Sequence, residues 1–497
     1  MKFPILCVVT LLGLTLNAAT PPNVLLILVD DLKPAIGAYG DPVAITPHLD
    51  RLASRGTRFD LAFCNQAVCA PSRNNLFTGL RSTTTGLYTL GLNFRHAVPD
   101  AVTLPQYFRS QGYHAASLGK VYHIGHGNVN DDASWSIPHH KELVIEYADP
   151  ASKPAGRLTR EEAMFSNYRG DSPVQDLPRS AAWESPEVPD ESYADGRIAA
   201  EAARRLLAHA ADPRQPFFLA VGFARPHLPF SAPRRYWDLY RREHLPLTVN
   251  PAPPADAPGY AIKRKGEITN YDPIPLSGDL DADLQRTLVH GYYASTSYVD
   301  AQIGKVLDAL DQTGLAANTI VIVWGDHGFH LGDHGSWTKH SNHEQANRIP
   351  LIFAGPGIAA GAATQSVAET VDIFPTLCDL AGLPAPRVPQ GLDGSSHAPA
   401  LRHPGTVVDT YAYHAYPRGG AKGENFLGRA IRTNRHRLVE WKTIGAPADT
   451  AEFELYDYWA DPHETHNLAS AQPGIVAALR LLLAQHPEAR PQSQRRP

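Results

Sequence analysis

The run Asn23-Val-Leu-Leu-Ile-Leu-Val29, followed at once by Asp30-Asp31, sets the class of this protein. Its seven residues are almost wholly apolar, and two adjacent carboxylates end it. A short apolar run of this kind is typical of a strand buried on both faces of a parallel sheet. The sequence therefore predicts an α/β protein with carboxylates at the C-terminal end of its first core strand.

Helices and strands alternate beyond this run. Thr46-Pro47 predicts the start of a helix through Leu49 and Leu52 that Gly56 ends. Further helices are predicted at about residues 104–112, 194–211 and 283–313, and strands at 114–118, 217–223, 319–324 and 351–354. This alternation indicates an α/β sandwich around one large, mostly parallel sheet.

Two long segments interrupt the alternation, and the pattern changes near the C-terminus. Residues 124–188 and 240–281 are polar and poorly periodic, so we interpret them as insertions that shape a substrate cleft. After about residue 401, short alternating stretches at 428–441 and 453–459 predict a small antiparallel sheet, closed by a helix at 475–483. The predicted units are a catalytic domain at 22–400 and a small C-terminal subdomain at 401–490.

The first nineteen residues have the pattern of a secretory signal peptide. Lys2 precedes an apolar run over residues 3–16, and Ala18-Ala19 offers a cleavage site. A membrane anchor is the weaker interpretation because the run is short for a bilayer, and no other stretch approaches spanning length. We expect a secreted or periplasmic protein without membrane attachment after cleavage. The absence of any Asn-x-Ser/Thr sequon favours bacterial export.

Composition and cysteine usage narrow the function. The chain has 497 residues, 43% of them hydrophobic and 19% charged, and a net charge of −5 without a long basic run, so nucleic acid is not an expected partner. After signal cleavage Cys64, Cys69 and Cys378 remain, which is too few for a disulfide scaffold. At least one free thiol in an oxidising compartment needs an explanation.

Charged residues follow two of the predicted strands. Asp30-Asp31 ends the first strand, and Asp326-His327 follows the strand at 319–324. Carboxyl ends of strands form the usual ligand crevice in open α/β sheets. Adjacent carboxylates repel each other unless a cation neutralises them, and oxygen-rich ligation favours Ca²⁺ or Mg²⁺. For Asp30-Asp31 taken alone, the alternative is two solvated aspartates in a turn. The matching Asp326-His327 at a second strand end makes this alternative weaker.

The segment Cys69-Ala-Pro71-Ser-Arg73 supplies a candidate nucleophile. We place Cys69 in a loop, against a helix that begins with Pro71 at its first position and ends at Gly79. Helix N-terminal N–H groups favour an anion there, and Arg73 lies one turn along. An activated thiolate and an inert structural cysteine are the alternatives.

This segment resembles a known signature. Cys-Ala-Pro-Ser-Arg at 69–73 with Phe-Thr-Gly at 77–79 resembles the signature of type I sulfatases, and the order of motifs resembles the iduronate-2-sulfatase branch most. The resemblance covers nearly the whole mature chain and includes residues 119–123, 225–230, 325–328, 335–339 and 454–457.

The resemblance implies a fold, a cofactor and a modified residue. It implies an alkaline-phosphatase-like fold and oxidation of Cys69 to Cα-formylglycine by a formylglycine-generating enzyme. One Ca²⁺ per chain would be bound by Asp30, Asp31, Asp326 and His327, with the modified Cys69 also in contact with it.

The resemblance also implies catalytic roles. Arg73 and Lys120 would orient the aldehyde hydrate, His123 would deprotonate it, and His227 or Lys339 would protonate the leaving alcohol. The substrate would contact His227, Lys339 and Phe329. Each of these side chains taken alone has a structural alternative; Lys120 and Lys339, for example, are residue types that usually lie on a solvated surface.

The expected activity is hydrolysis of sulfate esters, on a sulfated saccharide, through a sulfo-enzyme. A phosphodiester or phosphonate monoester hydrolase of the same fold is the first alternative, and a non-catalytic glycan-binding relative is the second. Histidines at 330, 334, 340 and 343 match no zinc signature, and His-Glu-Thr-His at 463–466 is one residue short of the metalloprotease motif.

Overall fold

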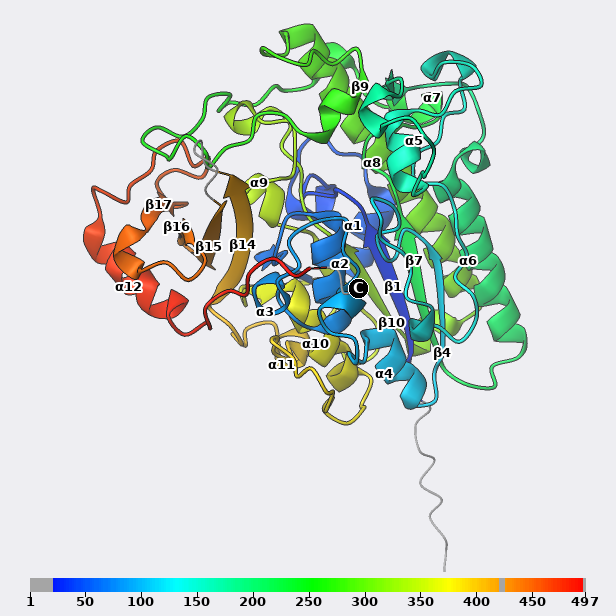
Figure 1. Cartoon of the computed structure of the whole chain (residues 1–497). Helices are drawn as coiled ribbons and strands as arrows, with labels where there is room; N and C mark the ends of the chain where they lie inside the picture. The colour runs from blue at the N-terminus through cyan, green and yellow to red at the C-terminus, as the bar shows by residue number, and fades with distance from the viewer. Residues whose placement is uncertain (1–20, 420–424, 495–497) are drawn as a thin grey trace, which may run out of the picture.

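The computed structural model describes residues 21–419 and 425–494 (Figure 1). The predicted signal segment at 1–19 lies outside the described residues. Within the described part of the chain, no helix has the length and apolar character needed to cross a membrane.

A seven-stranded sheet forms the centre of the molecule, in the order β12-β2-β11-β10-β1-β7-β4. The strands are β1 (Asn23–Val29), β2 (Gly56–Phe59), β4 (His114–Gly119), β7 (Phe217–Phe223), β10 (Thr319–Gly325), β11 (Leu351–Ala354) and β12 (Ala362–Thr364). β11 runs antiparallel to both of its neighbours, and all other pairs are parallel. The predicted mostly parallel sheet is confirmed.

Helices cover both faces of this sheet (Figure 1). Leu25, Ile27 and Val29 of β1 pack against α1 (Pro47–Ser54), α6 (Ala194–Ala211) and α8 (Ala282–Gln312). Val24, Leu26 and Leu28 pack on the opposite side against α2 (Cys69–Thr78), α4 (Leu104–Ser110) and α10 (Ile373–Leu380). The continuous apolar run of β1 is thus explained, because its alternating side chains enter two separate cores.

Gly56 has a different role from the predicted one. Helix α1 ends at Ser54 with Arg55 as its C-terminal cap, and Gly56 begins β2. A Cβ at position 56 would clash with the carbonyl oxygen of Phe353 on the neighbouring strand. Glycine is therefore needed here for close strand pairing rather than for ending a helix.

The two predicted insertions meet above the sheet (Figure 1). The first contains α5 (Arg160–Phe165), β5 (Ser180–Ala181) and β6 (Trp183–Glu184); the second contains β9 (Tyr271–Asp272). β5 pairs with β9, and β6 pairs with β8 (Phe230–Ser231). Asn270 also donates to Glu161 at 2.6 Å, so the two insertions form one covering structure.

A second, antiparallel sheet follows in the C-terminal part. It contains β14 (Tyr411–Gly419), β15 (Asn425–Thr433), β16 (His436–Thr443) and β17 (Glu452–Asp457), and α12 (Pro473–Leu483) packs on it. The stretch 428–441 therefore contains most of β15, the turn that follows it and most of β16. The Ala415 N–H donates to the Asn65 carbonyl at 3.0 Å, which joins β14 to the segment before α2.

Candidate active site

Two neighbouring strand ends carry the predicted metal ligands. Val29 of β1 pairs with Gly325 of β10, so Asp30 and Asp326 leave the sheet side by side. The Asp31 N–H donates to Asp326 Oδ1 at 3.1 Å, and all three aspartates are buried. Burial raises the pKa of Asp31 to about 8, because a carboxylate removed from water needs nearby positive charge to stay ionised.

His327 and Cys69 complete this group. His327 Nε2 lies 3.2 Å from Cys69 Sγ, and His327 Nδ1 lies 3.4 Å from Asp31 Oδ1. Donor atoms of Asp30, Cys69, Asp326 and His327 all lie within 4.8 Å of one another. Burial lowers the pKa of His327 to about 4, so its imidazole is neutral and available as a ligand. The arrangement is able to hold a divalent metal ion.

Cys69 is the first residue of α2, capped by Val68, and Pro71 is the third. The sequence analysis predicted that Cys69 lies in a loop and that the helix begins at Pro71. This prediction is wrong, because the helix begins two residues earlier. Proline is tolerated here because N–H groups of the first turn have no partner within the helix. Cys69 still lies at the positive end of the helix dipole. Gly79 ends α2 with φ of 68°, as predicted.

Arg73 and Lys120 contact the carboxylates of this group. Arg73 donates through Nε to Asp326 Oδ2 at 3.0 Å and through Nη2 to Asp30 Oδ1 at 3.1 Å. Lys120, directly after β4, forms an ion pair with the second oxygen of Asp30. Both cations are buried. They orient the two aspartates and offset the repulsion between them.

Glu267 connects Lys339 to His227. The Lys339 ammonium lies 3.1 Å from Asp31 Oδ1 and 2.8 Å from Glu267 Oε2. His227 Nε2 lies 3.1 Å from Glu267 Oε1, and its Nδ1 lies 2.6 Å from the Leu228 carbonyl. Glu267 belongs to the second insertion, where no motif or spacing marks it in the sequence.

His123 lies against residues of the first insertion. Its Nε2 is 3.0 Å from His126 Nδ1, and its buried Nδ1 has no hydrogen-bond partner. Burial and the nearby Lys120 charge hold the pKa of His123 well below its usual range. The ring of Phe165 contacts His123 and His227 and lies under the Lys120 ammonium. No sequence motif marks His126 or Phe165.

Phe329 lies behind the Asp31 turn. It is 1% exposed, stacks on Tyr292 and meets the edge of Phe230. The Tyr292 hydroxyl donates to the Asp31 carbonyl at 2.8 Å, and Asp31 itself has φ of 57°. Phe329 therefore supports the ligand turn through Tyr292, while its contact with substrate stays a prediction.

The remaining thiols and the histidines at 330, 334, 340 and 343 lie apart from this metal group. Cys64 and Cys378 are buried free thiols. The histidines are mostly buried, and none belongs to a potential metal group within the described residues.

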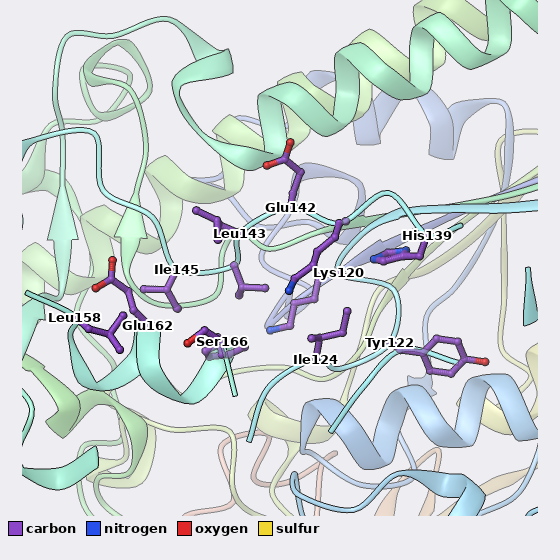
Figure 2. A pocket seen from close by; sticks show the side chains of 14 residues that line it. Lys120, Tyr122, Ile124, His139, Glu142, Leu143, Ile145, Leu158, Glu162 and Ser166 are labelled. Atoms are coloured by element: carbon purple, nitrogen blue, oxygen red, sulfur yellow. The ribbon is translucent and has the colours of Figure 1, made fainter. Parts of the chain in front are cut away.

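A cavity of about 180 Å³ lies next to the site (Figure 2). Its wall is mainly apolar and comes largely from the first insertion. The lining residues include Ile124, Leu143, Val144, Ile145, Leu158 and Phe165, together with Lys120, Lys141, Glu142 and Glu162. Phe165 lines the cavity and also contacts His123 and His227, so the cavity borders the candidate site without containing it.

Comparison with known families identifies the family to which this chain is similar. A family model described as Sulfatase matches residues 22–383, and one described as N-sulphoglucosamine sulphohydrolase, C-terminal, matches residues 332–486. The chain belongs to the sulfatase family. This sulfatase is a sulfuric ester hydrolase, as predicted.

Similar proteins agree with this assignment. Iduronate 2-sulfatase of Mus musculus is 33% identical over 535 residues, covering 93% of this chain and 94% of the relative. A solved structure in complex with its substrate D-glucosamine-2-N,6-O-disulfate has a TM-score of 0.71 at 22% identity, covering 94% and 97% of the two chains. The phosphonate monoester hydrolase of Agrobacterium radiobacter also gives 0.71 at 22% identity, covering 93% and 95%. The two structures confirm the predicted fold.

Proposed function

We propose that this sulfatase releases sulfate from a sulfated saccharide, with Ca²⁺ as its metal and Cys69 oxidised to Cα-formylglycine. The convergence of Asp30, Asp31, Asp326 and His327 on Cys69 at the start of α2 carries the proposal. Similarity to iduronate 2-sulfatase over most of both chains supports a sugar substrate. A formylglycine-generating enzyme would modify Cys69 during maturation, and the signal segment would direct export.

The donor set fits Ca²⁺. Three buried carboxylates and a neutral imidazole are available, and oxygen-rich ligation is the preference of this ion. The raised pKa of Asp31 indicates that the nearby Lys339 ammonium alone does not fully stabilise its ionised carboxylate. Bound calcium would supply positive charge that polarises a sulfuryl oxygen. Arg73 and Lys120 would keep Asp30 and Asp326 aimed at the ion.

Positive charge would surround a bound ester. Arg73, Lys120 and Lys339 lie among the carboxylates of Asp30, Asp31, Glu267 and Asp326. A divalent metal would add two positive charges to this group. These charges would attract the anionic group of a sulfate, phosphate or phosphonate ester, so charge alone does not choose among the three ester classes.

His227 and Glu267 provide the proton for the leaving alcohol. Because His227 Nδ1 donates to the Leu228 carbonyl, its Nε2 is unprotonated in the neutral ring. Nε2 lies 3.1 Å from Glu267 Oε1, which accepts no hydrogen bond from the described residues, and burial and the Lys120 and Lys339 charges hold the pKa of His227 well below its usual range. The Glu267 carboxylate would therefore have to attract a proton to Nε2 when substrate is bound. That proton would be passed to the leaving oxygen, while His123, neutral and with a free Nδ1, accepts one.

Glu267→Gln is expected to lower kcat on a sulfated sugar by about 10²-fold, the usual scale of general acid catalysis. Without the negative charge, His227 holds its proton less well. The Michaelis constant should not rise, because the site loses a carboxylate that repels sulfate. Aryl sulfates with acidic leaving groups need no proton and should lose much less. Steady-state kinetics on both substrate types measures the difference.

Glu161→Gln is the matched control for this effect. Glu161 lies in the other insertion and accepts from Asn270 at 2.6 Å. Burial raises the pKa of Glu161 to about 8, so it is largely protonated at pH 7 and glutamine is nearly equivalent. An equal loss on both substrate types in Glu267→Gln would show that Glu267 only maintains the structure.

Oxidation of Cys69 is tested directly by peptide mass. We expect the peptide spanning residues 64–81 to have lost one sulfur and two hydrogens and gained one oxygen, relative to the encoded sequence. Mass spectrometry after co-expression with a formylglycine-generating enzyme measures this change. An unmodified thiol in protein that releases sulfate at full rate would contradict the proposal.

A phosphonate monoester hydrolase is the second candidate, because such an enzyme shares the fold at the same TM-score as the sugar-bound structure. A phosphonate monoester is also singly charged, so charge does not separate the two. Comparison of kcat/KM for matched sulfate and phosphonate esters does. Preference for phosphorus would overturn the proposal, and sulfate release would exclude a non-catalytic glycan-binding protein.

A further inference from the structure

A second group of metal-ligand side chains lies outside the active site. It consists of Asp372, His397 and Asp409, named here the His397 cluster. Asp372 ends the short helix η11 (Thr370–Asp372), His397 precedes α11 (Ala398–Arg402), and Asp409 lies shortly before β14. His397 Nε2 lies 3.3 Å from Asp372 Oδ2 and 3.3 Å from Asp409 Oδ2.

The buried nitrogen of His397 lacks a hydrogen bond. The side chain is 1% exposed, and Nε2 lies near two carboxylates without a hydrogen-bond partner among the described residues. Ligands at zinc distances of about 2.0–2.2 Å, arranged as a tetrahedron, lie about 3.3–3.5 Å apart. The two observed separations match this edge length. They are long for a charge-assisted hydrogen bond, which is about 2.7–2.9 Å.

Neighbouring groups hold two of the three side chains, those of His397 and Asp372, in this arrangement. His397 Nδ1 lies 3.2 Å from Ser366 Oγ, and the ring meets the edge of Phe59. The two oxygens of Asp372 accept from the N–H groups of Glu369 and Ser395. Outer hydrogen bonds of this kind fix the orientation of metal ligands.

We propose that Asp372, His397 and Asp409 bind a divalent transition-metal ion, preferentially Zn²⁺, with water as the fourth ligand. Two carboxylates and a neutral imidazole carry two negative charges, which such an ion neutralises. One nitrogen and two oxygens in a tetrahedral arrangement suit zinc better than calcium, which takes six to eight oxygens. The Asp409 side chain is 41% exposed, so the ion has a route from solvent.

The ion would join three segments that support the nucleophile helix. Glu369, next to Asp372, contacts Asn65 and Arg81 on either side of α2 and accepts from the Tyr413 N–H of β14. Asp409 lies on the chain that enters β14. Zinc at the His397 cluster would therefore fasten the C-terminal sheet to the catalytic domain, as a structural and not a catalytic site.

Protons compete with the metal. In the metal-free protein, although burial opposes the charge, the carboxylates of Asp372 and Asp409 raise the pKa of His397 to about 9. Zinc must displace that proton from Nε2 at neutral pH, so its affinity should increase with pH up to about 9. The charged groups that face the ring are these two carboxylates; Ser366 and Phe59 add none.

Zinc binding by the full chain tests the proposal. The protein is kept in excess Ca²⁺, which would occupy the active site, and Zn²⁺ is the only ion titrated into it. Calorimetry should then show one tight zinc site, and zinc should raise Tm. His397→Gln and Asp409→Asn should abolish both effects, while His436→Gln, which alters another His–Asp pair, should keep them. Asp326→Asn should also keep them, which separates this site from the catalytic one.

Cobalt gives a second measurement. Co²⁺ at a four-coordinate site gives visible absorption bands, which should be present in the unaltered protein and absent in Asp409→Asn. The exposed side chain at 409 makes this variant the one that folds most safely. Absence of zinc binding in the unaltered protein, or unchanged binding in Asp409→Asn and His397→Gln, would overturn the proposal.

Discussion

Cys69→Ala should reduce sulfate release by on the order of 10⁴-fold or more, the scale seen when a catalytic nucleophile is removed. Alanine has no thiol to oxidise, so no formylglycine forms. The fold should persist, because only Sγ is lost and, among the described residues, its hydrogen-bonding contact is with His327. Calcium should still bind through the three aspartates and His327. Sulfate release, metal content and thermal unfolding of the variant measure these three expectations.

Cys64→Ala is the matched control. Cys64 is equally buried and lies five residues earlier on the same segment. Its removal should cost about 1–2 kcal/mol of folding stability through a small cavity and leave catalysis unchanged. A Cys69→Ala protein that kept more than a small fraction of the original rate would show that the nucleophile lies elsewhere.

The sequence predicts those elements of the fold that depend on the residues of a single segment. The continuous apolar run of β1 and the helical period of α6 are each properties of one segment, and both elements lie at the predicted bounds. The ligands Asp30 and Asp326 were predictable for the same reason. Each follows a strand, and parallel strands end at one edge of the sheet.

The start of α2 shows where local patterns are ambiguous. Proline lacks only an N–H group, and none of the first-turn N–H groups has a helical partner. Pro71 therefore fits the first position and the third equally well, and the sequence does not separate them. In the structure the helix begins at Cys69, whose Sγ lies 3.2 Å from His327 Nε2.

Glu267 and Phe165 could not be predicted because distant contacts place them. Each lies in an irregular insertion, and the insertions are joined by two-residue strands, β5 and β9, too short to leave a pattern. Glu267 reaches His227 and Lys339, which are 40 and 72 residues away in sequence. Only the assembled structure shows that the insertions bring Glu267 and Phe165 against His227.

Asp326→Asn is expected to weaken calcium binding and catalysis together, with activity lower by about 10³-fold. Asparagine keeps the size of the side chain but removes the charge that Arg73 contacts at 3.0 Å. Arg73 is 0% exposed and would keep only Asp30 as a charged partner. Breaking a buried ion pair of this kind costs about 3 kcal/mol or more, so a lower Tm should accompany the loss of metal.

Asp300→Asn separates a loss of metal from a general loss of stability. Asp300 is also buried, but it caps α1 by accepting from the N–H groups of His48 and Leu49. Asparagine offers one acceptor oxygen for these two N–H groups, so this variant should lose stability, while its metal content should stay at one ion per chain. Calcium analysis of both variants after equal dialysis gives the comparison. A full calcium content in Asp326→Asn would remove Asp326 from the ligand set, because a carboxylate in direct contact with the ion is not replaced by an amide without loss of affinity.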